Sequence, residues 1–144
     1  MKNQTVKIMN PQVMLVDDDA GVLFLHELMV LESGFSDQIT SFYKAETALN
    51  DLADQKNQDS EIVIFLDINM PGMSGWDFLK KLESSDFDKG VYIVMVTSSV
   101  HSSDRITANN FKHVIDFIEK PLNLEICEKL KGHESLKHLF TDDR

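Results

Sequence analysis

The chain has 144 residues, of which 42% are hydrophobic, and a formal net charge of -10 at pH 7. One compact domain of this size can bury roughly 70% of its unfolded surface, and the single cysteine excludes an internal disulfide framework. The negative charge repels phosphate backbones and argues against direct nucleic-acid binding. No stretch approaches the roughly 20 apolar residues of a membrane span, so we expect a cytoplasmic protein with no membrane partner.

Short apolar runs predict five strands along the chain. Their length and β-branched content are typical of strands buried on both faces of a sheet. They lie at residues 13–16, 39–43 (the weakest), 62–66, 92–96 and 114–118.

Helical patterns lie after each of these runs. Three segments have apolar stripes expected to cover the sheet, namely Val22, Leu25, Leu28 and Met29; Gly75, Phe78, Leu79 and Leu82; and Ile126, Cys127 and Leu130. Residues 45–53 and 103–110 are the expected second and fourth helices. Five βα units predict an α/β domain with a parallel sheet and helices on both faces, because parallel strands need crossover connections of this size.

Polar residues follow four of the predicted strands, at the edge where open α/β sheets bind ligands. These residues are Asp17 and Asp18, then Asp67, then Thr97 and Ser98, and finally Lys120. Two carboxylates about 4 Å apart repel by roughly 4 kcal/mol at an effective dielectric constant near 20, so converging aspartates need a cation. Mg²⁺ is favoured because it binds a few carboxylates and keeps waters for a phosphate. Alternatively, the acids only turn the chain and cap the next helix, which is the stronger interpretation for Asp19 alone.

Four motifs, LVDDD, IFLDINMPGMSG, VMVTSS and FIEKPL, occur in order on the expected strands. On these motifs, residues 12–130 resemble the response-regulator receiver domain of two-component signalling. The resemblance implies a flavodoxin-like, doubly wound five-stranded sheet with strand order 2-1-3-4-5. It also implies a single receiver domain over residues 1–144, with its core at 12–131 and a C-terminal extension at 132–144.

The resemblance assigns the phosphorylation chemistry residue by residue. Asp67 matches the phosphoacceptor, which takes a phosphoryl group from a phosphohistidine on a sensor histidine kinase or a histidine phosphotransfer protein. The implied Mg²⁺ ligands are Asp17, Asp18, Asp67 and the backbone carbonyl of Asn69. Asp18 is expected to bind the ion directly, and Asp17 partly through water.

Further residues match the catalytic and switch positions of the family. Thr97 and Lys120 match the side chains that hold the phosphoryl oxygens, and the bond from Lys120 to Pro121 is expected to be cis. Thr97 and Phe117 match the hydroxyl and aromatic residues of the conformational switch, although ordinary core packing is the alternative for Phe117. Access to the site and the rate of hydrolysis are expected to depend on Ser98 and Ser99.

The residues after Leu122 leave room for one helix and an extension. We therefore expect a stand-alone receiver that acts by docking to an unidentified downstream protein, or as a shuttle in a phosphorelay. It would be a self-phosphorylating and self-dephosphorylating signalling domain, not a turnover enzyme. Gly132 is expected to end the last helix, and the segment after it either covers the sheet edge or mediates dimerisation.

Two competing functions are open at the sequence level. A small phosphatase of the haloacid-dehalogenase type would use Asp17 as nucleophile and Asp19 as acid/base, but it leaves Asp67 unexplained. A receiver that signals without phosphorylation would keep a folded site that takes no label. The histidines are interpreted as surface or packing residues, because none pairs with a second ligand at metal-site spacing; they are His26, His101, His113, His133 and His138.

Overall fold

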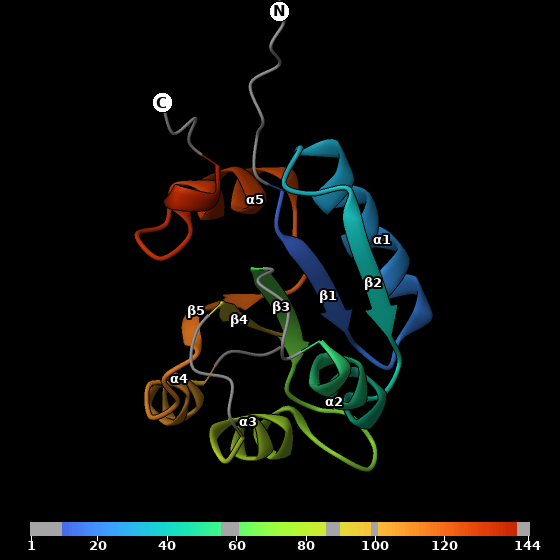
Figure 1. Cartoon of the computed structure of the whole chain (residues 1–144), viewed down its shortest axis with the longest axis vertical. Helices are drawn as coiled ribbons and strands as arrows, with labels where there is room; N and C mark the ends of the chain where they lie inside the picture. The colour runs from blue at the N-terminus through green and yellow to red at the C-terminus, as the bar shows by residue number, and fades with distance from the viewer. Residues whose placement is uncertain (1–9, 56–60, 86–89, 99–100, 141–144) are drawn as a thin grey trace, which may run out of the picture.

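A computed structural model describes residues 10–55, 61–85, 90–98 and 101–140. Within these ranges the chain forms a five-stranded parallel sheet in the order β2-β1-β3-β4-β5 (Figure 1). The strands are β1 (Gln12–Val16), β2 (Gln38–Phe42), β3 (Ile62–Asp67), β4 (Val91–Thr97) and β5 (Val114–Glu119). This order confirms the predicted doubly wound α/β fold.

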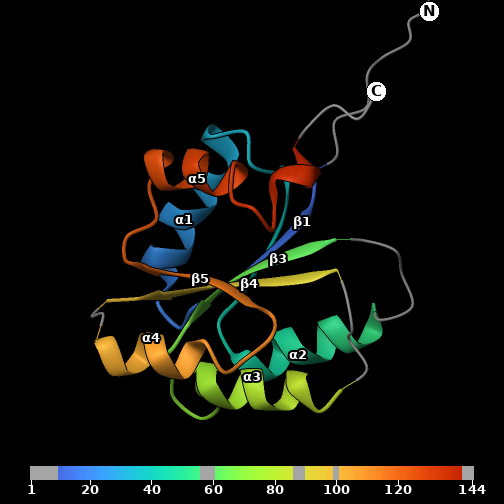
Figure 2. The same cartoon turned by 90° about the vertical axis from the view of Figure 1, so that its left-hand side faces the viewer.

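Helices cover both faces of the sheet (Figure 2). α1 (Ala20–Glu32) and α5 (Leu124–Lys131) lie on one face, and α2 (Ala45–Asp54), α3 (Gly75–Glu83) and α4 (Ser102–Ala108) lie on the other. Because successive side chains of a strand point to opposite faces, the two residues Met14 and Val16 belong to one core cluster, and Val13 and Leu15 belong to the other. No helix in the described ranges is both long enough and apolar enough to span a membrane.

The predicted buried stripe of α1 was wrong. Leu25 and Leu28 are 39% and 37% exposed, and the buried residues of the helix are Leu23, His26 and Val30. Apolar residues surround most of this helix, so periodicity could not select the face that packs on the sheet. In contrast, the stripe predicted for α3 is confirmed, since Gly75, Phe78, Leu79 and Leu82 are all buried.

The segment after α5 packs on the core of its own chain. Gly132 is the C-cap of α5, and the short 3-10 helix η1 (Lys137–Leu139) follows. Leu136 and Leu139 are buried in the cluster beneath α1 and α5, and the rings of Phe140 and Phe35 lie 4.8 Å apart. η1 lies at the end of the sheet opposite the carboxyl ends of the strands (Figure 1), where the segment packs on the core of its own chain. The choice between covering the sheet edge and mediating dimerisation stays untested.

Truncation of Leu136 tests this packing. Leu136→Ala is expected to lower the free energy of unfolding by roughly 2–5 kcal/mol, because it leaves a cavity at a fully buried site. The matched control is Leu124→Ala, at a side chain that is 45% exposed, with an expected effect within about 0.5 kcal/mol. Urea denaturation of both variants measures the difference, and equally small effects would show that the extension contributes no core.

Candidate functional site

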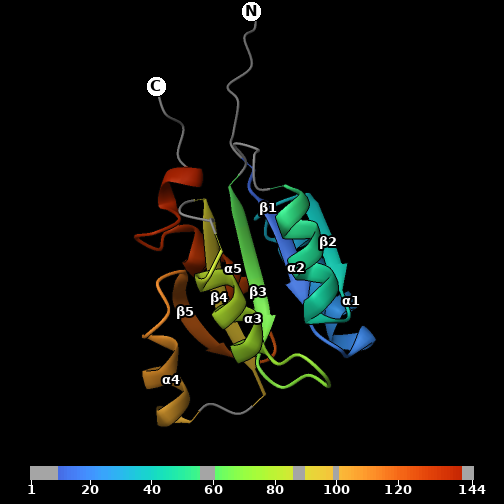
Figure 3. The same cartoon turned by 60° about the horizontal axis from the view of Figure 1, so that its bottom comes forward.

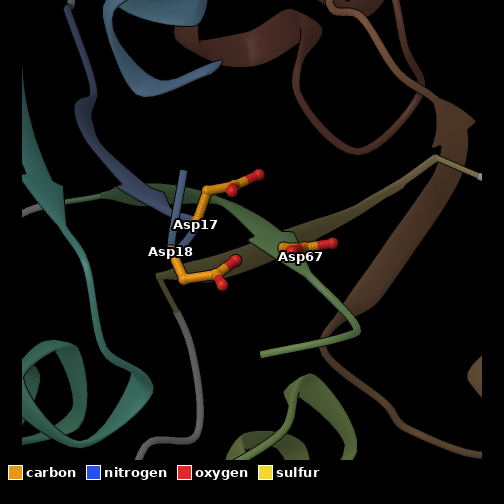
Figure 4. Close-up of side chains that lie close together, drawn as sticks. All are labelled: Asp17, Asp18 and Asp67. Carbon is orange, nitrogen blue, oxygen red and sulfur yellow. The ribbon is translucent and has the colours of Figure 1, made fainter. Parts of the chain in front are cut away.

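The carboxyl ends of the neighbouring strands β1 and β3 lie side by side (Figure 3), and three aspartates come together there. Asp17 and Asp18 follow β1, and Asp67 ends β3. One carboxylate oxygen of each lies within 4.8 Å of the other two (Figure 4). Asp17 and Asp67 are buried, whereas Asp18 is exposed. Two acids of the cluster are therefore shielded from solvent, and the third is accessible to it.

Lys120 reaches this cluster from the far side of β4. Its Nζ lies 2.7 Å from Oδ2 of Asp17 and 3.6 Å from Oδ2 of Asp67. The backbone N–H of Lys120 donates to the carbonyl oxygen of Thr97 at 2.7 Å, which ties the turn after β5 to the end of β4. The Lys120–Pro121 peptide bond is cis, as the resemblance implied. One ammonium thus faces two buried carboxylates.

The electrostatics of Asp67 reflect this crowding. Burial first, and then the charge of Asp17, raise the pKa of Asp67 to about 6, although the Lys120 ammonium and the backbone N–H of Asn69 oppose the rise. Burial also disfavours the charged form of Lys120. The hydrogen bond to Asp17 and the charges of Asp17 and Asp67 outweigh that effect, so the pKa of Lys120 lies above its ordinary value and the side chain stays an ammonium. Carboxylate charge exceeds the ammonium charge at this site.

The loop after β3 approaches the backbone of Asp67 closely. A Cβ on Gly75 would lie 2.5 Å from the backbone oxygen of Asp67 and 2.9 Å from Cα of Ile68. Glycine therefore lets α3 begin directly against the strand end, where the Gly75 N–H donates to the Ile68 carbonyl at 2.8 Å. Ser74 and Asp77 form a capping box at the start of α3. This contact fixes the direction in which the chain leaves Asp67.

Asp19 has the capping role that was favoured for it. Its Oδ1 accepts hydrogen bonds from the backbone N–H groups of Gly21 at 2.9 Å and Val22 at 3.2 Å. The Asp19 N–H in turn donates to Oδ1 of Asp17 at 2.9 Å. Asp19 is exposed and is not one of the three clustered acids. Asp19 therefore stabilises the start of α1 as its N-cap.

The other predicted site residues that the structure describes lie at or just beyond the carboxyl ends of β3 and β4. Thr97 is buried at the end of β4 and Ser98 is exposed beside it. Asn69 is exposed and follows Asp67 by two residues. Ser99 lies outside the described residues. The catalytic, metal-binding and tuning roles of these residues stay predictions.

The predicted switch aromatic lies on β5 under a cation. Phe117 is 6% exposed, and the guanidinium carbon of Arg105 on α4 lies 5.2 Å from the centre of its ring. Such a cation–π contact contributes about 0.5–1 kcal/mol at exposed sites and more when desolvated. α4 is thereby attached to Phe117, and the sequence analysis did not single out Arg105.

A second residue that sequence reasoning missed is His26. It is 3% exposed on the inner face of α1, and its Nε2 accepts a hydrogen bond from the backbone N–H of Leu122 at 3.1 Å. Burial lowers its pKa, opposed by the charge of Asp17. A histidine at helical spacing from Leu23 and Val30 was the available signal, but the wrong stripe was chosen for this helix.

The donor set fits a hard divalent cation. Three carboxylates with oxygens within 4.8 Å of one another are the ligand type that Mg²⁺ prefers. Burial and then the charge of Asp17 raise the pKa of Asp67, and the Lys120 ammonium only partly offsets this rise. A divalent ion would relieve the repulsion among the acids while leaving room for waters or phosphoryl oxygens.

Comparison with known proteins identifies the family. Residues 13–131 match the family model of the response regulator receiver domain. The chain belongs to this family. Receiver domains are signalling domains of two-component systems, typically phosphorylated on an aspartate. They bind Mg²⁺ at an acidic cluster and receive phosphate from histidine kinases or phosphotransfer proteins. The match, together with the capping role of Asp19, does not favour the phosphatase alternative.

Individual relatives agree with the family match. A two-component response regulator of Arabidopsis thaliana is 28% identical over 122 residues, which are 85% of this chain and 30% of that protein. The transcriptional regulatory protein PrrA of Mycobacterium leprae is 34% identical over 126 residues, which are 87% of this chain and 50% of that protein. The chain therefore spans half or less of the length of these two curated relatives.

Two solved structures share this fold over nearly their whole length. A two-component response regulator from Cytophaga hutchinsonii has a TM-score of 0.75 at 26% identity, covering 86% of this chain and 96% of that chain. A CheY-like receiver domain protein from Methanospirillum hungatei has a TM-score of 0.68 at 28% identity, covering 90% and 96%. The similarity thus extends over the sheet and its covering helices.

The raised pKa of Asp67, caused first by burial and then by the charge of Asp17, predicts a pH-dependent stability in the metal-free receiver. The folded pKa of about 6 lies above the ordinary value of 3.8 for an aspartate, so in this interval the folded state holds a proton that the unfolded state loses. Stability should therefore fall as the pH rises through this interval. Asp67→Asn removes that loss, and we expect it to raise the thermal unfolding midpoint at neutral pH.

Calorimetry in the presence of a chelator, across this pH interval, measures the effect. Asp19→Asn is the matched control, because asparagine caps a helix as well as aspartate does. An Asp67→Asn variant that is less stable than wild type at neutral pH, or that keeps the wild-type pH dependence, would contradict the raised pKa of Asp67.

Proposed function

We propose that this receiver accepts a phosphoryl group on Asp67 from a phosphohistidine donor in an Mg²⁺-dependent reaction. The observation that carries the proposal is the convergence of three carboxylates with an ammonium 3.6 Å from Asp67 Oδ2. A phosphoryl acceptor needs a nucleophile surrounded by positive charge. The same phosphorylation is proposed to change the α4 and β5 surface, which a partner protein reads.

The reaction follows from the groups present. A carboxylate oxygen of Asp67 bonds to phosphorus while the bond from phosphorus to the donor imidazole nitrogen breaks, and that nitrogen keeps the electron pair. A pKa of about 6 leaves Asp67 mostly ionised at neutral pH, as a nucleophile requires. Mg²⁺, when held by Asp17, Asp18, Asp67 and the Asn69 carbonyl, supplies charge neutralisation at the phosphoryl oxygens. The product is an acyl phosphate.

Lys120 and Thr97 are proposed to hold the phosphoryl oxygens. The transition state is loose, so positioning and positive charge contribute more than covalent chemistry. The short distance of Lys120 to Asp67 and the raised pKa of its ammonium support a role as fixed positive charge. Thr97 ends the strand between β3 and β5, which supports a hydroxyl contact from the third side. The exposure of Ser98 supports an open entrance, and hydrolysis is proposed to be tuned by Asn69 and Ser99.

The proposed switch uses two packings of β4 and β5. Thr97 would move toward the phosphoryl group, and Phe117 would fill the space left behind. Phe117 lies on the strand adjacent to Thr97 and is buried. Phenylalanine keeps the steric part of this coupling but lacks a hydroxyl for an outward hydrogen bond. Phosphorylation can bias the pair because packed cores have discrete alternatives within a few kcal/mol.

The outer face of α1 is proposed to bind the donor. Phe24, Leu28 and Leu31 recur at helical spacing and are 66%, 37% and 44% exposed. Leu124, at the start of α5, adds a further exposed apolar side chain. α1 begins three residues after Asp17, so a helix that rests on this apolar stripe lies near the acidic cluster. Exposed apolar patches of this kind mark protein-binding surfaces.

That the receiver acts as a stand-alone protein stays a prediction, because the curated relatives it matches are longer. The same holds for the division into a core at 12–131 and an extension at 132–144. Docking to a downstream protein and relay of the phosphoryl group are both open to such a unit. A turnover activity is not part of the proposal.

Labelling by acetyl phosphate tests the acceptor. In the presence of Mg²⁺, intact-mass spectrometry should show one added phosphoryl group on wild type and none on Asp67→Ala. Lys120→Met should lower the labelling rate by roughly 10²–10³, the size typical of a lost electrostatic contact to the transition state. Asp19→Asn should label like wild type. A folded wild type that takes no label would favour signalling without phosphorylation, and label on Asp17 would favour the phosphatase alternative.

Transfer from a protein donor tests whether the apolar stripe of Phe24, Leu28 and Leu31, the docking stripe, binds that donor. Phe24→Glu should lower the rate of transfer from a phosphorylated histidine phosphotransfer protein by roughly tenfold or more, because it places a charge in an apolar contact. The rate with acetyl phosphate should be unchanged. The matched control is Ile106→Glu on α4, because Phe24 and Ile106 are both 66% exposed. Equal transfer rates for the two variants would remove α1 as the docking surface.

A further inference from the structure

A polar residue occupies the buried face of α1. Leu23, His26 and Val30 form that face, and the cluster around it consists of apolar side chains from β1, β3, α5 and the segment after α5. An imidazole is costly to bury unless its nitrogen atoms find hydrogen-bond partners. The partner of His26 therefore indicates why a histidine, and not an aliphatic residue, occupies this position.

That partner belongs to the turn that carries Lys120. The backbone N–H of Leu122 donates to Nε2 of His26 at 3.1 Å, and the Leu122 side chain is 1% exposed. Two residues earlier, the backbone N–H of Lys120 donates to the Thr97 carbonyl at 2.7 Å. The turn is thus held at both ends, by β4 on one side and by α1 on the other. The side chain of Lys120, at the first of these two points, extends its ammonium to the acidic cluster.

The hydrogen bond defines the state of the imidazole. Because a backbone N–H is the donor, Nε2 must be unprotonated, and the proton of the neutral ring lies on Nδ1. Burial favours this neutral form and lowers the pKa of His26. The side chain therefore acts as a hydrogen-bond acceptor inside an apolar cluster, where an unmade bond of Leu122 would leave a buried N–H without a partner.

We propose that His26 is a positioning residue for Lys120, which holds the turn after β5 so that the ammonium meets Asp17 and Asp67. The proposal deepens the proposed function and rests on it, because it assumes that Lys120 binds the phosphoryl group. His26 itself touches no reacting atom. Its hydrogen bond also attaches the turn to α1, the helix whose outer face carries the proposed docking stripe.

Two variants separate the hydrogen bond from the packing. His26→Met fills a similar space without an acceptor of comparable strength, whereas His26→Gln can place its amide oxygen near the position of Nε2. The probe is beryllofluoride, a phosphoryl mimic, titrated by calorimetry in the presence of Mg²⁺. We expect His26→Met to weaken beryllofluoride binding roughly tenfold or more, which is the size of loss seen when a hydrogen-bond partner of a metal ligand is removed. His26→Gln should restore most of the affinity, and Mg²⁺ binding should not weaken in either variant.

A double-mutant cycle identifies the route of the effect. In a Lys120→Met background, His26→Met should cause no further loss of beryllofluoride affinity. An undiminished loss in that background, or wild-type affinity in His26→Met alone, would overturn the positioning role. A wild type that binds Mg²⁺ but no beryllofluoride would instead refute the proposed function, and this inference would be refuted with it.

A measurement on the unaltered protein covers the case in which His26→Met does not fold. The ¹⁵N chemical shifts of the His26 ring report which nitrogen carries the proton. An unprotonated Nε2, with slow exchange of the Leu122 amide, is expected. A proton on Nε2, or rapid exchange of that amide, would overturn the inference.

Discussion

The repulsion among three carboxylates at the ends of two neighbouring strands is the constraint on which the site depends. Charges about 4 Å apart repel by roughly 4 kcal/mol at an effective dielectric constant near 20. Lys120 is within 4 Å of Asp17 and Asp67, at 2.7 Å and 3.6 Å. Even so, burial and then the charge of Asp17 raise the pKa of Asp67 to about 6. A site with surplus negative charge and hard oxygen donors is suited to a divalent cation and, through it, to a phosphoryl group.

Strand pairing, the close start of α3 and two hydrogen bonds hold these charged groups together. The parallel pairing of β1 and β3 fixes the spacing of their ends, and Gly75 lets α3 begin against the backbone of Asp67. The ammonium arrives from β5 on a turn that is hydrogen-bonded to Thr97 and to His26. The acidic cluster and the proposed docking surface therefore depend on the same helices. α1 carries His26 inside and an apolar stripe outside, and α4 contacts Phe117 through Arg105.

Much of this arrangement could be predicted from the sequence, because a parallel sheet delivers the ends of its strands to one edge. The short apolar runs located Asp17, Asp18, Asp67 and Lys120 at that edge, and the motifs in their order indicated the strand order. The cap at Asp19 was also predictable, since its partners are two and three residues away.

Other features depend on contacts that the sequence does not display. The buried face of α1 could not be chosen from periodicity, because both faces of that helix are apolar. The bond from Leu122 to His26 joins residues separated by 96 positions, and no local pattern marks it. The raised pKa of Asp67 follows from burial in the folded protein. These features are consequences of tertiary packing.

A crystal structure of the receiver grown with Mg²⁺ tests the convergence of charges most directly. We predict one ion beside β1 and β3, bound by the carboxylates of Asp18 and Asp67 and the carbonyl of Asn69, with Asp17 bound partly through water and the Lys120 ammonium beside it. An ion bound elsewhere, or side chains of Asp18, Asp67 and Lys120 that point away from a common centre, would contradict the central claim.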